Sequence, residues 1–134
     1  MKIRPFVSED YAGVLAVLAA GKVEPPKEIT ELRGPCFVAE LYGEIVGVIF
    51  ALSGPSTKAY IDYLAVREDM RGTLVFSRLL DAIESELKRL GVKRYIFHIE
   101  KHNTKALDQL LKYRDRYGIT MLRDLFYFAR EIHA

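Results

Sequence analysis

The sequence predicts an α/β fold in which helices cover the faces of a mixed β-sheet. Three observations predict it. Apolar runs rich in β-branched and aromatic residues alternate with longer stretches whose apolar residues recur every three or four positions, turn residues separate the two kinds of segment, and 50% of the chain is hydrophobic. The length of 134 residues suits one domain spanning 1–134.

The first part of the chain is expected to hold a strand, two helices and a β-hairpin. Lys2–Phe6 alternates as a short strand does, and Ser8 can cap a helix that ends at Gly21. The connector after it has room for a short helix between residues 26 and 33. Two β-rich runs then flank Gly43-Glu44, which we interpret as a hairpin turn.

The second part alternates strands and helices. Ala59–Val66 is a predicted strand, and a long helix with an apolar stripe follows it to about Leu90. Val92–Glu100 is the next strand, a helix is expected from Asn103 or Thr104 to Gly118, and residues 119–132 close the chain as one or two strands. About six or seven strands and about four helices are therefore expected in one sheet-and-helix sandwich.

Two stretches carry a resemblance to a known family. In "YIDYLAVREDMRGTLVFSRLL" the residues Leu64 to Val66 match an L-x-V motif, and Arg71-Gly72 matches R-G. Further on, "NTKALDQLLKYRDRYGI" resembles N-x-x-A followed by a tyrosine-bearing helix. With these motifs the chain resembles the GNAT superfamily of acyl-coenzyme-A-dependent N-acyltransferases over essentially its whole length.

The resemblance implies a GNAT fold with splayed central strands. The pantetheine arm of acetyl-coenzyme A would pair with the open edge of one strand, and a loop at a helix N-terminus would bind the pyrophosphate. The coenzyme-binding residues that it implies are Leu64, Ala65, Val66, Arg71, Gly72, Thr73, Leu74, Val75, Phe76 and Asn103.

The implied reaction moves an acetyl group from acetyl-coenzyme A to the amine of a small-molecule or peptide acceptor, by direct attack in a ternary complex and without a metal. A general base helps, because the attacking amine must be neutral. Asp62 is the first candidate, since strict alternation places it on the face of Leu64 and Val66, and His98 and Glu100 are alternatives. A surface carboxylate on a half-exposed sheet has the same pattern.

The leaving thiolate needs a proton, and Tyr113 is the predicted donor. The family position of this tyrosine falls on Leu110, and Tyr113 lies one helical turn beyond it, with Tyr117 in reserve. A packing or surface tyrosine is the other interpretation of Tyr113.

One departure from the family pattern leaves a second function open. The family pattern places glycines where this chain has Leu74 and Phe76, so a GNAT-fold binding or regulatory module that has lost ordinary coenzyme binding is the alternative. The basic segment Lys112–Tyr117 interleaves aromatic and cationic residues, but a solvated helix end explains it better than nucleic-acid binding.

The remaining expectations concern the cysteine and the surroundings of the protein. Cys36, the one cysteine, is expected to be buried and structural. A cytoplasmic location without membrane contact is expected, and the scarcity of Asn and Gln beside many charged residues is typical of a thermophile. A homodimer through an open sheet edge is one further expectation.

Overall fold

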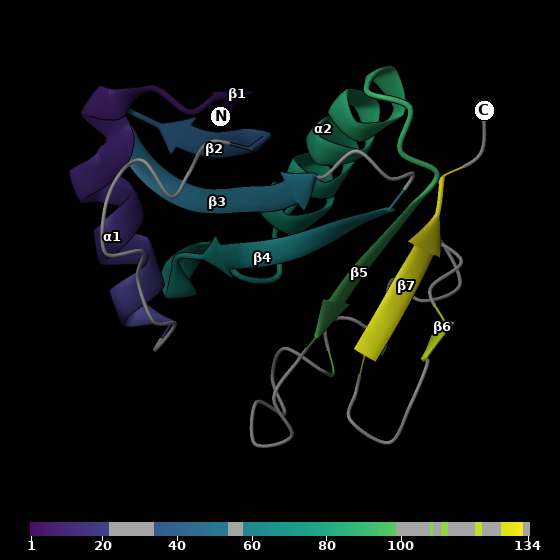
Figure 1. The fold of residues 1–134 in the computed structure, drawn as a ribbon. Coiled ribbons are helices and arrows are strands. Elements are labelled where there is room, and N and C mark those ends of the chain that lie inside the picture. Colours follow the sequence, from purple (N-terminus) through teal and green to yellow (C-terminus); the bar gives the residue numbers. More distant parts are fainter. Residues whose placement is uncertain are drawn as a thin grey trace.

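A computed structural model of the protein describes residues 1–21, 34–53, 58–98, 108, 111–112, 120–121 and 127–132. These residues form a seven-stranded sheet in the order β1-β2-β3-β4-β5-β7-β6. Helix α1 (Tyr11–Ala20) covers one face of the sheet and helix α2 (Val75–Arg89) the other (Figure 1). The predicted α/β class and number of strands are confirmed.

Five of the six strand pairs in the sheet are antiparallel, and one is parallel. The strands are β1 (Lys2–Pro5), β2 (Cys36–Leu41), β3 (Glu44–Ser53), β4 (Lys58–Val66), β5 (Arg94–His98), β6 (Thr120–Met121) and β7 (Tyr127–Glu131). The pair β4–β5 is the parallel one, so the sheet is mixed as predicted.

Single turns of 3-10 helix, η1 (Ser8–Asp10) and η3 (Glu68–Met70), precede α1 and α2. The helix expected between residues 26 and 33 lies outside the described residues. Of the helix expected from Asn103 or Thr104 onward, residues 108, 111 and 112 are described, and all three are helical.

Two apolar clusters hold the helices on the sheet. On one face Leu79 and Ile83 of α2 lie in a buried cluster with Ile49, which we call the α2 cluster, and on the other Val14 of α1 and Val38 belong to a second one, the α1 cluster. All five side chains are fully buried, and each such burial stabilises a fold by roughly 1.5–3 kcal/mol. The apolar stripe predicted for the long helix is confirmed at its centre, whereas Leu90, predicted as its last member, follows the helix end and is 46% exposed.

Helix α2 approaches β3 closely because Gly47 has no side chain. A Cβ atom at this position would lie 2.9 Å from Cγ1 of Val75 and 3.0 Å from Cδ1 of Leu79. Ordinary carbon–carbon contacts are about 3.5–4.0 Å. Gly47 therefore sets how deeply the first turn of α2 sits on the sheet.

The turn between β2 and β3 is Tyr42-Gly43, so the predicted turn at Gly43-Glu44 is wrong by one residue. Glu44 pairs with Leu41 and belongs to the ladder. Tyr42 and Gly43 have φ angles of 51° and 79°, and a two-residue hairpin turn of type I′ requires this left-handed backbone at both positions. The glycine occupies the second turn position rather than the first.

The predicted capping role of Ser8 is also wrong. The Ser8 hydroxyl donates to Oε2 of Glu9, and Oδ2 of Asp10 accepts the backbone N–H of Val7 at 2.9 Å. Because the segment begins with a 3-10 turn, the carboxylate three residues after Val7 is the group that reaches back to it.

Strands β4 and β5 diverge after a short junction. Their ladder consists of Lys58–Arg94, Ala59–Tyr95 and Tyr60–Ile96, although β4 continues to Val66. In Figure 1 the two strands separate like the arms of a V, with β7 following β5 away from β4. The splayed central strands that the family resemblance implied are present.

Within the part of the chain that the structure describes, no helix is both long and apolar enough to cross a membrane.

Candidate functional site

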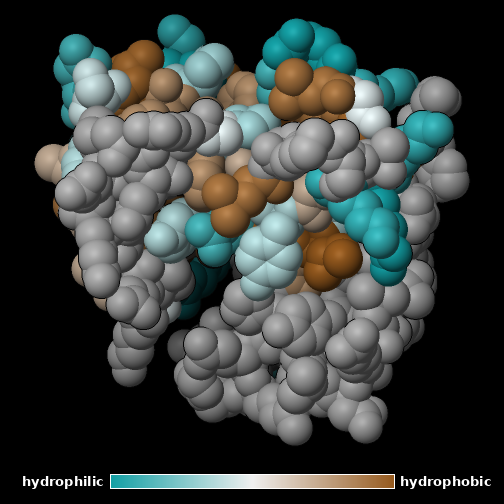
Figure 2. All heavy atoms as spheres, viewed as in Figure 1, coloured by the Kyte–Doolittle hydropathy of each residue, from teal (hydrophilic) through white to brown (hydrophobic). Residues whose placement is uncertain are grey.

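The open edge of β4 is the first component of the site. On one side β4 pairs with β3 from Ala59 to Val66, while the described residues hold no ladder between β4 and β5 beyond Tyr60. Tyr60 and Ile96, the last register partners, are both half-buried, and Figure 2 shows apolar side chains reaching the surface between the diverging strands. An extended ligand could therefore lie along β4 with apolar side chains beneath it.

A β-bulge in β4 changes which side chains share a face. Phe50 pairs with Tyr63 but Ala51 pairs with Ile61, so Asp62 is the extra residue. Ile61 consequently packs in the α2 cluster with Leu64, whereas Tyr63 packs in the α1 cluster.

Asp62 is the preferred base because strict alternation along the strand would place it beside Leu64 and Val66. The bulge interrupts this alternation at Asp62 itself. Strict alternation from Asp62 to Leu64 and Val66 would place Ile61 on the opposite face, and this expectation is wrong, because the bulge inserts one residue into the pattern. Asp62 is half-buried on β4, and its role as a base stays a prediction.

Three backbone N–H groups lie in a row where β4 leads into α2. Gly72, Thr73 and Leu74 follow η3 and precede the first turn of α2, and their N–H groups donate no hydrogen bond to any described residue. We call these three groups the N–H cradle. A helix N-terminus with unpaired donors attracts anions, because the helix dipole adds to the hydrogen-bonding capacity.

The backbone of this loop requires glycine at one position only. Gly72 has a φ of 80°, in the left-handed region, and a Cβ there would meet nothing within 4 Å. Leu74 has φ −78° and ψ 1°, a conformation open to any residue. The retained Gly72 is therefore the glycine that this loop needs.

The two bulky residues that replace family glycines point in different directions. Leu74 is 63% exposed, and Phe76 is half-buried and packs against the α2 cluster. Val75 between them is fully buried. Neither of these two side chains is therefore folded over the N–H groups of the loop.

Side chains brace the loop at both ends. The hydroxyl of Thr73 donates to the carbonyl oxygen of Met70, and Nε of Arg71 donates to the carbonyl oxygen of Val66 at 3.3 Å. The exposed Arg71 guanidinium thus lies at the end of β4, close in sequence to the cradle, where it adds positive charge.

Arg67 ties this region to the β2–β3 hairpin. Its guanidinium donates to both carboxylate oxygens of Asp69, at 2.6 and 3.0 Å, and to Oε2 of Glu44 at 2.8 Å. The hydrogen bonds from Arg67 hold the pKa of Asp69 below its usual value. The backbone N–H of Arg67 also donates to the carbonyl oxygen of Val46 at 2.8 Å.

The structure brings together one part of the predicted site. Residues 64–66 and 71–76 form the continuous end of β4, the loop and the start of α2. Asn103, Tyr113, Glu100 and Tyr117 lie outside the described residues, and so does the side chain of His98 at the end of β5.

Sequence reasoning missed two residues that shape the site, Gly47 and Arg67. A glycine inside a β-rich run is a known sign of close approach by another segment, so "EIVGVIF" offered a signal for Gly47. The link from Arg67 to the hairpin offered none, since Glu44 is remote in sequence, although the other partner of Arg67, Asp69, is only two residues away.

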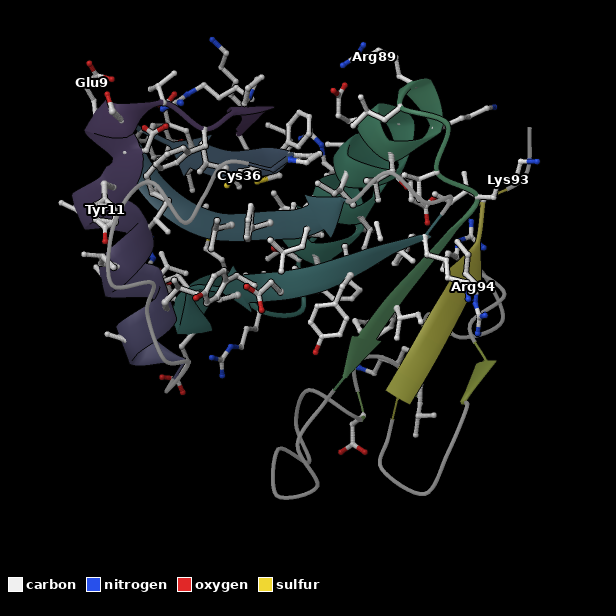
Figure 3. All side chains as sticks on the ribbon, viewed as in Figure 1. Glu9, Tyr11, Cys36, Arg89, Lys93 and Arg94 are labelled. Carbon is white, nitrogen blue, oxygen red and sulfur yellow. The ribbon has the colours of Figure 1, made fainter. Side chains whose placement is uncertain are left out.

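Cys36 is buried, as predicted, and takes no part in the site. It is 7% exposed in the α1 cluster, and burial, with a smaller effect of the Asp10 charge, raises the pKa of its thiol to about 12. It is the first residue of β2, and Figure 3 shows it well apart from β5.

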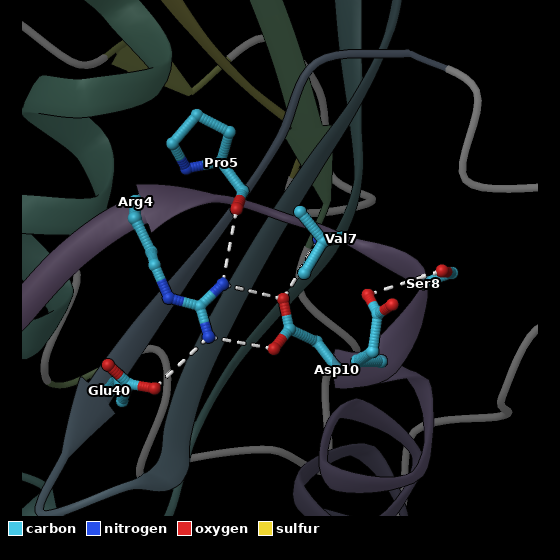
Figure 4. A network of polar contacts seen from close by, with 7 residues as sticks. Arg4, Pro5, Val7, Ser8, Asp10 and Glu40 are labelled. Carbon is cyan, nitrogen blue, oxygen red and sulfur yellow. Dashed lines mark hydrogen bonds and ion pairs between the residues drawn. The ribbon is translucent and has the colours of Figure 1, made fainter.

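A groove of about 490 Å³ runs between α1 and the β2–β3 hairpin and reaches Arg67. Asp10, on its wall, accepts two hydrogen bonds from Arg4 at 2.7 and 2.8 Å, and Arg4 also reaches Glu40 (Figure 4). The hydrogen bonds from Arg4 lower the pKa of Asp10, against the opposing effect of burial. Asp10 and Glu40 already share Arg4, so that guanidinium is not available to an anionic ligand, and we do not count this groove as part of the anion-binding site.

Among the described residues no group of three or more His, Cys, Asp or Glu side chains could hold a metal ion. The geometry supports an extended site instead. It consists of the open edge of β4, followed by the N–H cradle and by the guanidinium of Arg71 at the end of the strand.

A family comparison agrees with this geometry. The model of the acetyltransferase (GNAT) family matches residues 9–112. The search among curated proteins found no match.

Solved structures with the same fold cover nearly the whole chain. Ard1 from Thermoplasma volcanium is 22% identical, with 99% of this chain and 98% of that chain covered and a TM-score of 0.78. The diaminobutyrate acetyltransferase EctA from Paenibacillus lautus, in complex with L-2,4-diaminobutyric acid and coenzyme A, is 17% identical, with 98% and 94% covered and a TM-score of 0.77. An aminoglycoside 6'-N-acetyltransferase complexed with coenzyme A is 14% identical, with 100% and 98% covered and a TM-score of 0.80.

Proposed function

The chain belongs to the GNAT acetyltransferase family, and on this basis we propose that it transfers an acetyl group from acetyl-coenzyme A to the amine of a small-molecule or peptide acceptor. The observation that carries the proposal is the N–H cradle, placed where the open edge of β4 meets the N-terminus of α2. Gly72, Thr73 and Leu74 would bind the pyrophosphate, with Arg71 beside them. The edge of β4 from Leu64 to Val66 would hold the pantetheine arm.

The proposed chemistry needs two proton transfers that involve the chain's own residues, one to a base and one from an acid. Acetyl-coenzyme A would supply a thioester whose carbonyl carbon the amine attacks, so that a C–N bond forms and the C–S bond breaks. Asp62 is proposed to accept the proton that the amine gives up, and Tyr113 to donate one to the thiolate. A backbone N–H near the end of β4 would polarise the carbonyl oxygen.

Replacing Leu74 by proline tests the cradle with little effect on the fold. The φ of −78° fits the proline ring, the leucine side chain is largely exposed, and the lost N–H donates to no described residue. A hydrogen bond to a charged group contributes about 1.5–3 kcal/mol, so we expect the affinity for coenzyme A to fall roughly 10- to 150-fold.

Leu74→Ala is the matched control, because it removes the same side chain and keeps the N–H group. Titration calorimetry with coenzyme A measures both variants, and thermal denaturation checks that both fold. Equal affinities of the two variants would refute the cradle. A wild-type protein whose melting temperature does not rise with millimolar coenzyme A or acetyl-coenzyme A would refute the proposed function as a whole.

The alternative of a binding module without coenzyme predicts a loop closed by Leu74 and Phe76. Leu74 is instead exposed and Phe76 packs against the core. The positions of these two side chains therefore support the enzymatic proposal over this alternative, and tight binding of acetyl-coenzyme A with turnover would exclude the alternative.

A further inference from the structure

One carboxylate oxygen on α2 joins the helix to two strands of the far half of the sheet. Oε1 of Glu84 accepts a hydrogen bond from the hydroxyl of Tyr95 on β5 at 2.7 Å and another from Nε of Arg130 on β7 at 2.7 Å. Tyr95 is fully buried, and the side chains of Glu84 and Arg130 are only 15% and 19% exposed. This is a partly buried, charge-assisted junction between three elements.

The junction lies at the apex of the V formed by β4 and β5. Tyr95 and Arg130 are register partners in the β5–β7 ladder. Tyr95 is also the partner of Ala59, the middle one of the three pairs that join β4 to β5. In Figure 3 the neighbouring Arg94 marks this end of β5, where the divergence begins.

The two halves of the sheet are attached to α2 in different ways. The first turn of α2 rests on β3 through Val75, which would touch a Cβ at Gly47. Among the described residues, the interactions that hold β5 and β7 include three ladder pairs with β4, apolar contacts of β5 in the α2 cluster and the hydrogen bonds to Glu84. A buried ion pair adds little net stability, but its geometry is specific, and in some proteins such a pair selects one arrangement of the packed elements.

We propose that Glu84 is a positioning residue that fixes the angle at which β5 and β7 leave β4. It thereby sets the width of the opening along the edge of β4. This inference rests on the proposed function, since that opening is where the pantetheine arm would lie. Glu84 acts through Tyr95 and Arg130 and does not touch the ligand.

The variant Glu84→Gln tests the proposal with two ligands. Coenzyme A uses both the V and the cradle, whereas 3′-phosphoadenosine diphosphate, the coenzyme without its pantetheine arm, uses the cradle alone. We expect Glu84→Gln to weaken coenzyme A binding by about fivefold or more and to leave the binding of the nucleotide within about twofold of the wild type, because only the preorganised opening is lost. Tyr95→Phe, which removes only the hydroxyl, should act in the same direction.

Asp10→Asn is the matched control, because it neutralises a carboxylate of similar burial that is paired with Arg4 away from the V. It should leave the affinities for both ligands unchanged. A purely structural role of Glu84 would give the same affinities for Glu84→Gln and Asp10→Asn, or an equal loss for both ligands, and either result overturns the proposal.

A measurement without ligand separates this inference from the proposed function. Residual dipolar couplings of backbone amides report the orientation of β5 and β7 relative to β1–β4. A changed orientation in Glu84→Gln, with none in Asp10→Asn, supports the proposal even if the wild type binds neither ligand and the proposed function fails. An unchanged orientation in Glu84→Gln overturns the proposal whatever the ligands do.

Discussion

Replacing Gly47 by alanine is expected to push the first turn of α2 away from β3. The added Cβ would lie 2.9 Å from Cγ1 of Val75 and 3.0 Å from Cδ1 of Leu79, with the carbonyl oxygen of Ala65 at 3.4 Å. Val75 is fully buried and β-branched, so its side chain has one strongly preferred rotamer in the helix and cannot turn aside. The helix must therefore shift.

Overpacking of this kind costs about 1–3 kcal/mol, and alanine recovers about 0.5–1 kcal/mol that glycine loses in a strand. We therefore expect the free energy of unfolding to fall by about 0.5–2 kcal/mol. Because the first turn of α2 follows directly on the N–H cradle, we also expect weaker binding of coenzyme A.

Gly13→Ala is the control for this prediction. Its Cβ would lie 2.8 Å from Cγ1 of Ile45, so it produces similar crowding under α1, on the opposite face of the sheet. Urea denaturation measures the free energies of unfolding and calorimetry the affinities. The reasoning is refuted if Gly47→Ala unfolds within about 0.5 kcal/mol of the wild type, or if both variants bind coenzyme A equally well.

Three further predictions follow from single residues. Gly72→Ala should cost about 1–2 kcal/mol in the free energy of unfolding, because φ is 80° there, and a melting temperature equal to that of the wild type would contradict this. The folded pKa of Asp10 is lowered by Arg4, so the ion pair stabilises the fold above the unfolded carboxyl pKa of about 4, and this contribution is lost as the pH falls through the lower folded value. Denaturation from about pH 6 to about pH 2 should then show the stability gap between wild type and Asp10→Asn closing in acid, and a constant gap would count against it. Cys36, with a thiol pKa of about 12, should resist iodoacetamide at neutral pH in the native protein and react in urea, and rapid labelling of the native protein would show the burial to be wrong.

The sequence was informative where a residue's role depends on its near neighbours. The stripe of α2 follows from helical spacing, and the same spacing places Phe76 toward the core. The loop after β4 was located from Val66 and Arg71-Gly72. The hairpin turn was misplaced by one residue, because the pattern does not show which of two turn positions the glycine occupies.

Other features depend on partners remote in the chain, and no local pattern encodes them. The bulge at Asp62 appears only when β4 is aligned with β3, because it inserts a residue into an otherwise regular alternation. The depth of α2 depends on Gly47, and the junction at Glu84 on residues of β5 and β7. For this reason the location of the candidate site was predictable, whereas the faces and angles that shape it were not.

The three-pair junction between β4 and β5 also bears on the order in which the chain folds. On either side of it the ladders are antiparallel, and β2–β3 and β3–β4 join strands that follow one another in the chain. The junction itself is parallel and closes only after the chain has passed through α2. Closing this junction costs loop-closure entropy, and only three ladder pairs compensate for it. We therefore expect β1–β4 and β5–β7 to form first and the β4–β5 junction to close late. The short ladder that leaves an edge of β4 open for a ligand is thus also the part of the sheet that we expect to form last during folding.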